Sequence, residues 1–294
     1  MDKKVVLVIA VVVMLLVTPL SVFAYSTLTQ NINHSAKAKA DSEEATLNAI
    51  QAAIGDTGAN WTAGATSVSE LSWEEKKNLC GLKGFPGVEE GAKMEPKQYP
   101  PTFDWRDVNG TDWTTTIKDQ GACGSCWAFG LLAAMEAQNN IEEADPSIDL
   151  DLSEQCLLSC SPGSCDGWFM HSTLNWLRDT GTVDETCFPY QADDTIPCSD
   201  VCPDWQDGVW RIDDWGWVTP SLNNIKGYLL EAPLPTGMTV YQDFFHYDGG
   251  VYEHVWGGVQ GGHLVTIVGW DDTNGCWICK NSWELTGEKM DGSG

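Results

Sequence analysis

The chain has 294 residues, enough for one large domain or two ordinary ones, and its apolar content of 43% is typical of a globular protein. It carries 42 acidic residues against 16 basic ones, which gives a net charge of −26. This charge would repel a nucleic-acid backbone, so we expect no nucleic-acid partner.

The first 24 residues match the pattern of a secretory signal peptide. Two lysines precede an apolar stretch at 5–16, and a small-residue cleavage pattern ends at Ala24. The alternative is an uncleaved membrane anchor, but the stretch is shorter than the about 20 residues of a spanning helix, and Pro19 interrupts it. We therefore expect a secreted or otherwise extracytoplasmic protein with no stable membrane span after cleavage. If the protein is eukaryotic, an acidic endomembrane compartment is an alternative location. The eleven cysteines agree with an oxidising environment.

Residues 25–101 are polar and contain two short helical patterns. The first runs from Asp41 to Gly55 and the second from Ser72 to Gly81, each with a glutamate three residues after its start, which is the spacing of a capping box. Residues 84–101 follow, rich in glycine and proline, and are not expected to fold alone.

A stronger helical pattern begins at Cys126, after a loop that ends in Gly124 and Ser125. Apolar residues recur at steps of three and four through Met135, as one buried helix face requires. Ser125 is a candidate N-cap, which places Cys126 in the first turn, where free amide groups and the helix dipole favour an anion. A thiol there loses its proton more easily, and the thiolate is a nucleophile. The alternative is a buried and inert cysteine.

The remaining elements are first helical and then strand-like. Ser153 can cap a helix that reaches Leu158, and residues 170–179 form another. The predicted strands and turns come after Pro233: strands at 238–241, 251–255, 264–269 and 276–280, with turns at 248–250 and 274–275. Helices followed by strands predict an α+β fold in which a helical half packs on a β half.

Three fragments occur in a fixed order: QGACGSCWAF around Cys126, GGHLVTIVGW with His263, and CKNSW with Asn281. The CGSCW signature followed by His and Asn roughly 130–150 residues downstream resembles the papain family of cysteine proteases. The resemblance covers about residues 103–283. The NLCG fragment and residues 250–270 are similar to cathepsin B, but the His-His pair of the cathepsin B occluding loop has no counterpart here.

The resemblance implies a papain-like two-domain fold, with a helical domain packed against a β-barrel-like domain and the active site in the groove between them. It implies the following division: a signal peptide at 1–24, an inhibitory propeptide at 25–101, a helical domain with the nucleophile at 102–215, and a β-rich domain with His and Asn at 216–294. Residues 284–294 are too short and too polar to supply the closing strands of the family, so the last domain looks truncated.

The same resemblance gives each site residue a role. Cys126 is the expected nucleophile, His263 carries the proton, and Asn281 orients the imidazole. Trp283 shields that hydrogen bond, and the amide of Gln120 joins the backbone N–H of Cys126 in an oxyanion hole. The implied substrate-binding residues are Gly167, Trp168, Phe169 and Trp283, with Trp168 in place of a second glycine, where its bulk could narrow the groove. We expect Cys126 and His263 to rest as thiolate and imidazolium.

The cysteine pairing implied by the resemblance is Cys123 with Cys165 and Cys160 with Cys198; the sequence does not fix the others. Two other classes compete: Cys123 and Cys126 as a redox pair, and Cys276 and Cys279 as half of a zinc site. A non-catalytic binding protein on the same fold is a third alternative. We expect a secreted endopeptidase made as a zymogen, acting on polypeptides through a thioester, inhibited by its own propeptide, and needing no cofactor or metal.

Overall fold

The computed structural model describes residues 39, 41–84 and 91–283. The predicted signal peptide and residues 284–294 lie outside the described residues. The chain divides into two compact units, residues 1–46 and residues 47–294. In the first unit the described residues, 39 and 41–46, are helical. All that follows concerns the second unit.

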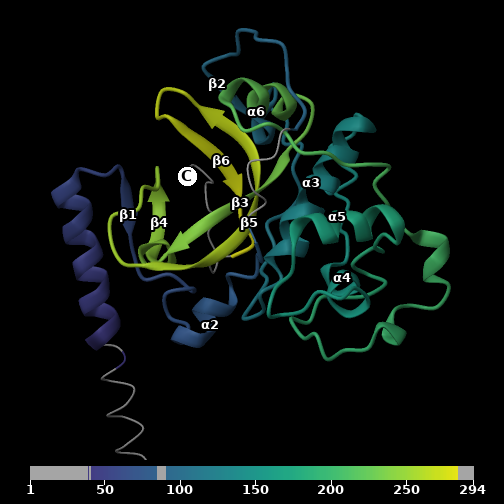
Figure 1. The fold of residues 1–294 in the computed structure, drawn as a ribbon, viewed down its shortest axis with the longest axis horizontal. Helices are drawn as coiled ribbons and strands as arrows, with labels where there is room; N and C mark the ends of the chain where they lie inside the picture. Colours follow the sequence, from purple (N-terminus) through teal and green to yellow (C-terminus); the bar gives the residue numbers. More distant parts are fainter. Residues whose placement is uncertain (1–38, 40, 85–90, 284–294) are drawn as a thin grey trace, which may run out of the picture. The chain divides into compact units, whose positions relative to one another are not determined.

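The second unit opens with helical residues 47–57, and its helices then precede most of its strands (Figure 1). The elements are β1 (Trp61–Ala63), α2 (Trp73–Asn78), β2 (Thr102–Asp104), α3 (Cys126–Glu142), α4 (Glu154–Cys160), α5 (Met170–Asp179), α6 (Leu222–Leu229), β3 (Leu234–Tyr241), β4 (Tyr247–Gly250), β5 (Val259–Asp271) and β6 (Cys276–Lys280). In Figure 1, α3, α4 and α5 gather on one side and the sheet of β3, β5 and β6 lies on the other. The predicted α+β arrangement is confirmed.

The main sheet is built around β5, which pairs antiparallel with β2, β3 and β6. Within the described residues this sheet is open rather than closed into a barrel. Residues 262–270 of β5 are buried without interruption, because the strand lies between two apolar cores. A strand buried on both faces reads as a continuous apolar run, as LVTIVGW does here.

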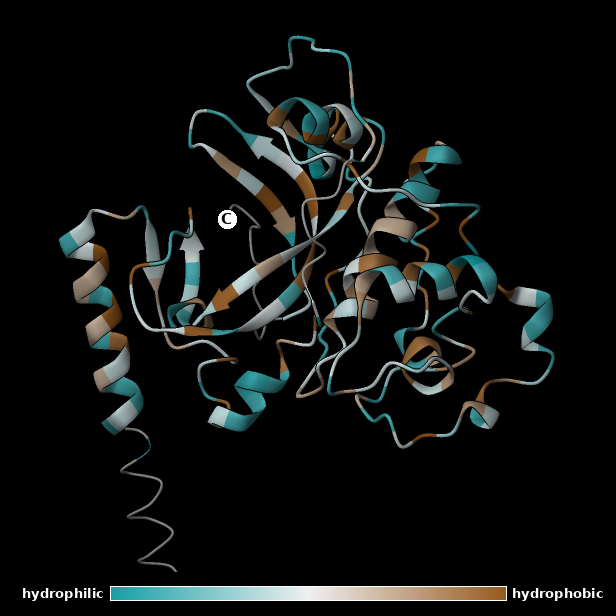
Figure 2. Ribbon diagram, viewed as in Figure 1, coloured by the Kyte–Doolittle hydropathy of each residue, from teal (hydrophilic) through white to brown (hydrophobic). Residues whose placement is uncertain are grey.

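The two cores position the ends of α3 and β5. In the first core, Trp127 and Leu131 of α3 pack with Leu264 of β5 and with leucines of α4. In the second, Trp270 and Ile267 of β5 pack against Leu229 of α6. Figure 2 shows hydrophobic residues on α6 and on the strands of this sheet. Both cores include residues of β5, so residue 263 lies on a strand that is anchored on both faces.

Several predicted elements differ from the structure: β3 and β5 begin before the predicted 238 and 264, and α2 is shorter than the predicted 72–81. Residues 251–255 form no strand; the strand is β4 at Tyr247–Gly250, where a turn was predicted, because it pairs with β1. The β1 residues that pair with β4 lie more than 180 positions earlier in the chain, so no local sequence pattern predicts this pairing. The first helix also continues past Gly55 to residue 57, and Gly58 takes the positive φ (71°) that ends it.

Six cysteines form three disulfides. The two implied pairs, Cys123–Cys165 and Cys160–Cys198, are both present, and the third joins Cys187 to Cys202. The free cysteines are Cys80, Cys126, Cys156, Cys276 and Cys279. In the described part of the chain, no helix has both the length and the apolarity that a membrane span requires.

Candidate active site

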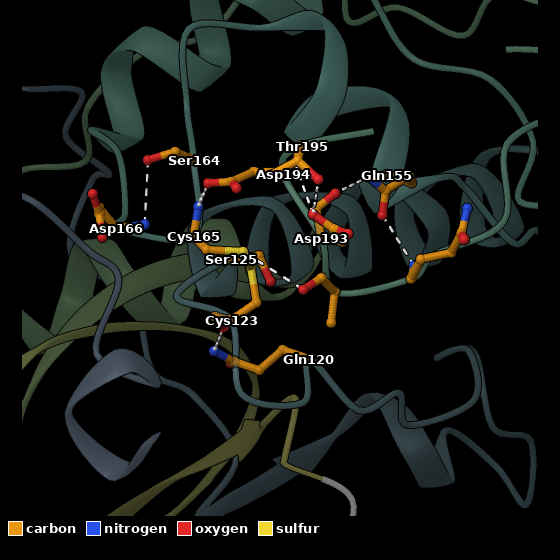
Figure 3. The surroundings of a disulfide bond; sticks show 12 residues. Gln120, Cys123, Ser125, Gln155, Ser164, Cys165, Asp166, Asp193, Asp194 and Thr195 are labelled. Carbon is orange, nitrogen blue, oxygen red and sulfur yellow. Dashed lines mark hydrogen bonds between the residues drawn. A yellow bond between two sulfur atoms is a disulfide. The ribbon is translucent and has the colours of Figure 1, made fainter. Parts of the chain in front are cut away.

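Cys126 is the first residue of α3 and is fully buried. Ser125 stands at the N-cap, as predicted, but its hydroxyl makes no capping bond and instead pairs with the Tyr190 hydroxyl at 2.6 Å. The loop before the helix is held by the Cys123–Cys165 disulfide and by a 2.7 Å bond from Gln120 Nε2 to the Cys123 carbonyl (Figure 3). The nucleophile candidate therefore begins a helix whose preceding loop is cross-linked.

His263 and Asn281 meet because β6 pairs with β5. Nε2 of His263 lies 2.7 Å from Oδ1 of Asn281, which directly follows β6. The indole of Trp283 covers the imidazole, with ring centroids 4.5 Å apart. Because Oδ1 of Asn281 only accepts hydrogen bonds, this contact assigns a hydrogen to Nε2 of the ring.

Gln120 connects the loop of the nucleophile candidate to the end of β6. Its Oε1 accepts hydrogen bonds from the Ser282 hydroxyl at 2.8 Å and from Trp283 Nε1 at 3.1 Å. Its Nε2 donates to the carbonyls of Cys123 and, at 3.1 Å, Leu79. One amide thus contacts both walls of the site and the segment that enters it.

The sulfur of Cys126 lies against β5. Cys126 packs with Leu264, the residue after His263, and with Leu82 in one apolar core, and the backbone amides of Leu264, Gly81 and Leu82 lower the pKa of its thiol. The structure therefore brings Cys126, Gln120, His263, Asn281 and Trp283 into one site.

A segment from the N-terminal part of the chain, Leu79 to Lys83, runs through this site. The amide of Leu82 donates to the carbonyl of Gly262 at 3.0 Å, and the amide of Lys83 donates to the carbonyl of Trp168 at 2.9 Å. The Trp168 amide in turn donates to the Gly81 carbonyl at 2.9 Å. The segment, which we call the cleft segment, is thus paired by its backbone with β5 on one side and with the loop before α5 on the other.

Comparisons with known proteins agree with this geometry. A family model described as papain family cysteine protease matches residues 99–292. The chain belongs to the papain family of cysteine proteases. Cathepsin B-like CP3 of Giardia intestinalis is 36% identical over 199 residues, which cover 63% of this chain and 65% of that protein. Cathepsin B-like CP2 of the same organism is 32% identical over 206 residues, covering 66% of this chain and 67% of its own. The matches thus span about two thirds of the length of these relatives.

Solved structures of precursor forms share the fold. Procathepsin B S9 from Trypanosoma congolense superposes with a TM-score of 0.70 at 24% identity, covering 84% of this chain and 89% of that one. Digestive procathepsin L2 from the larval midgut of Tenebrio molitor has a TM-score of 0.67 at 25% identity and covers 83% of this chain and 81% of that one. Both superpositions cover more of this chain than the family model at residues 99–292 does, so the similarity extends into the N-terminal part.

Within this papain-family site, glycines permit the close approach of the cleft segment. A Cβ at Gly81 would lie 1.7 Å from the carbonyl oxygen of Gly124, and a Cβ at Gly167 would lie 2.1 Å from the carbonyl oxygen of Gly81. Gly167 also has a φ of 97°, which favours glycine. Two backbones can approach this closely only without side chains at both positions.

Trp168 replaces the glycine that the family usually has, but its backbone still pairs with the cleft segment. Its indole packs edge-to-face on Trp127, with ring centroids 5.4 Å apart, and lies over Gly163. The following residue, Phe169, is 41% exposed and lies 3.1 Å from where a Cβ of Gly84 would stand. In this structure, the bulk of Trp168 therefore joins the helical core beside the groove and leaves the backbone pairing intact.

The electrostatic state of the covered site differs from the predicted ion pair. Burial raises the pKa of the Cys126 thiol to about 11, although nearby backbone amides lower it. Burial also lowers the pKa of His263 to about 4, opposed by Asn281 and by the Leu79 carbonyl. Both groups are therefore neutral near pH 7 in this state. The resting thiolate and imidazolium stay a prediction for the uncovered site; in the covered site the cleft segment excludes the water that would solvate the charges.

A buried ionic cluster beneath the site was not found from the sequence. Lys118 Nζ lies 2.9 Å from Glu136 of α3 and 3.0 Å from Glu154 of α4, whose pKa burial raises to about 8. Lys280, next to Asn281, donates to the Thr115 hydroxyl at 2.7 Å. The sequence feature that could have predicted this cluster is the presence of a charged residue, Glu136 or Lys280, in a segment that is otherwise mostly apolar.

The competing chemistries can be compared with the same structure. Cys123 is bonded to Cys165, so it is not a redox partner of Cys126 here. Cys276 and Cys279 are both free on β6, and in the described part of the chain no three His, Cys, Asp or Glu side chains form a group that could hold a metal ion.

Proposed function

We propose that the protein is a secreted cysteine endopeptidase, made as a zymogen, that hydrolyses polypeptides through Cys126, His263 and Asn281. One observation carries the proposal: the cleft segment occupies the place where these three residues and Gln120 converge, and is paired there by its backbone. A groove that binds a peptide backbone beside a thiol and an imidazole suits peptide-bond hydrolysis.

The proposed reaction follows from the hydrogen-bond assignment of His263. Nε2 donates to Asn281, so Nδ1 is the nitrogen that takes the proton of the Cys126 thiol. The thiolate attacks the substrate carbonyl carbon, and the imidazolium then gives its proton to the leaving amine, which leaves a thioester. Water, deprotonated by His263, hydrolyses the thioester and restores the thiol.

Gln120 is the proposed oxyanion donor. Its Nε2 now donates to the carbonyl of Leu79, so the same N–H faces a carbonyl oxygen that belongs to the cleft segment. When a substrate replaces the segment, this donor stabilises the developing oxyanion together with the backbone N–H of Cys126. Removing one such donor typically lowers the rate by about 10²–10³, so Gln120→Ala in the trimmed protein should lower kcat by that factor.

The N-terminal part up to about residue 101 is the proposed inhibitor. The amides of Gly81 and Leu82 in its cleft segment lower the pKa of the Cys126 thiol, while burial raises it more. Further along, the Ala92 amide donates to the Trp217 carbonyl at 2.6 Å, which holds the chain against the second half of the unit. Removal of this part is the proposed activation step.

The test compares full-length and trimmed protein on an internally quenched peptide blocked at both ends, with Cys126→Ser as control. We expect cleavage only by the trimmed protein with Cys126 intact. Equal activity before and after trimming contradicts the inhibitory role. Trimming of free C-termini without cleavage of the blocked peptide contradicts the endopeptidase assignment. If the trimmed protein cleaves nothing and a thiol label does not react with Cys126, the result supports the alternative of a non-catalytic binding protein on the same fold.

A further inference from the structure

The cleft segment carries a free thiol of its own, Cys80, directly before Gly81. Cys80 belongs to the part of the chain that the proposed function removes, and the proposed reaction makes no use of it. Its neighbours on both sides are fixed: the Leu79 carbonyl binds Gln120 Nε2, and the Gly81 carbonyl binds the Trp168 amide. Cys80 therefore holds a defined position in the site.

That position is beside the sulfur of Cys126. The backbone on both sides of Cys80 lies against Gly124, two residues before Cys126: a Cβ at Gly124 would lie 2.6 Å from the Asn78 carbonyl oxygen and 3.2 Å from the Cα of Gly81. A disulfide between them needs the two Cα atoms about 4.4–6.8 Å apart, with the two side chains directed toward each other. The Cys80 side chain also packs against β5: a Cβ at Gly261 would lie 3.6 Å from the Cys80 sulfur. Gly261 is two residues before His263, so the free thiol lies at the catalytic edge of the strand.

The two thiols also influence each other electrostatically. Burial raises the pKa of Cys80 to about 12, and a negative charge on Cys126 raises it further. Two thiolates this close repel each other, whereas a disulfide carries no charge and is compatible with a buried site. Cys156, Cys276 and Cys279 have no such relation to Cys126 among the causes that shift their pKa values.

We propose that Cys80 and Cys126 form a disulfide in the zymogen under oxidising conditions, which ties the cleft segment covalently to the sulfur that it covers. The oxidant is a low-molecular-weight disulfide such as oxidised glutathione. One cysteine thiolate attacks it and releases one glutathione thiolate, and the second cysteine then displaces the other. Two protein thiols are oxidised, one disulfide is reduced to two thiols, and two protons pass to those thiols.

The bond adds a second condition to activation. Proteolysis between residues 84 and 101 would cut the chain, yet the fragment bearing Cys80 would stay attached until a reductant cleaved the disulfide. The inference rests on the proposed function for the role of Cys126, but the bond itself is measured without any activity assay.

The test uses full-length protein equilibrated for hours in graded mixtures of reduced and oxidised glutathione, because both sulfurs are buried and exchange is slow. Free thiols are alkylated, and peptides are mapped by mass spectrometry without reduction. We expect a linked peptide of Cys80 and Cys126, with both residues losing alkylation at the same glutathione ratio while Cys276 remains alkylated. Cys276→Ser, the matched control, should give the same linked peptide.

Cys80→Ser should abolish the linked peptide and leave Cys126 as the alkylated thiol or its glutathione adduct. Separate glutathione adducts on Cys80 and Cys126 in the parent protein, with no linked peptide while the three other disulfides are intact, overturn the proposal. After proteolytic trimming without reductant and then denaturation, which releases the apolar contacts, the fragment should stay attached in the parent and separate in Cys80→Ser. Failure of the proposed function is a different result: trimmed, reduced Cys80→Ser that cleaves no peptide, whether or not the parent forms the link.

Discussion

Two of the regions that attach the N-terminal part of the second unit to the rest differ in the contacts that hold them. The first, which we call the anchor, consists of β1 paired with β4: Trp61 is almost fully buried and its ring lies 5.2 Å from that of Tyr252. The second is the cleft segment, which is held by backbone hydrogen bonds and by the buried side chains of Leu79 and Leu82, and which requires glycine at position 81. The anchor supplies apolar burial, and the cleft segment supplies the geometry that covers the sulfur.

The contrast shows how a segment can be kept in the groove of its own chain by apolar contacts that lie outside that groove. Ile50, Trp61 and Ala63 form a separate apolar core at the anchor, away from Cys126. The cleft segment adds little apolar surface beyond Leu79 and Leu82. Changes at the anchor should therefore alter how strongly the segment is held, and changes at Gly81 should alter whether it fits at all.

The largest effect is expected from Gly81→Ala. The new Cβ would meet the Gly124 carbonyl at 1.7 Å, which is backbone on a cross-linked loop and cannot move away, so the cleft contact should be lost at a cost above about 4 kcal/mol. The measurement is the rate at which a thiol reagent labels Cys126 in untrimmed protein, which should rise strongly. Gly55→Ala, where a Cβ meets nothing within 4 Å, is the control. Unchanged labelling in Gly81→Ala would show that the segment is not what covers the sulfur.

Trp61→Ala tests the anchor and should cost about 3–5 kcal/mol, as truncation of a buried tryptophan does. Hydrogen exchange should accelerate at β1 and, because the chain is continuous, at the cleft segment as well. Trp73→Ala is the matched control, since Trp73 is 40% exposed and should give a much smaller change. Acceleration at β1 alone would mean that the two regions hold the chain independently.

Acid should weaken the cleft contact through His263. The comparison is made in Cys126→Ser, where no thiolate can pair with the imidazolium: burial holds the pKa of His263 at about 4 while covered, against 6.5 when solvated, so the uncovered state binds more protons between these values. Lowering the pH from 7 to 4 should therefore favour the uncovered state by up to about 3 kcal/mol. Hydrogen exchange of the cleft segment, corrected for intrinsic rates, measures this. His263→Gln should remove the pH dependence and His171→Gln should retain it; the reverse pattern would refute the assignment to His263.

The smallest effect is expected from Ser72→Ala, at α2 between the two regions. Ser72 and Glu75 form a reciprocal capping box, and loss of an N-cap side chain costs about 1 kcal/mol. The exchange of α2 amides should accelerate while the anchor remains protected. Glu75→Gln should change little, because glutamine can fill the same role. If Ser72→Ala released both regions, α2 would be a rigid connector rather than a local helix.

The sequence predicted the residues of the site better than it predicted their state. Cys126, His263 and Asn281, which the structure brings together, were predicted because a local signature fixes a helix start, a strand position and the residue after a strand at characteristic separations. The neutral state of Cys126 and His263 could not be predicted, because it arises from burial under a segment that local patterns do not place. For the same reason β4 was predicted as a turn: its glycines suit a turn, and only pairing with β1 makes it a strand.

The position of Gln120 has a consequence for how fast activity could appear. Its amide oxygen is fixed by Ser282 and Trp283, and its nitrogen by Cys123, so none of these three contacts depends on the departing segment. When Leu79 leaves, one N–H of the Gln120 amide loses its acceptor but keeps its position, and the residues that hold Gln120 do not have to rearrange. Such a site is preorganised before it is uncovered, and turnover should begin without a lag once the fragment dissociates.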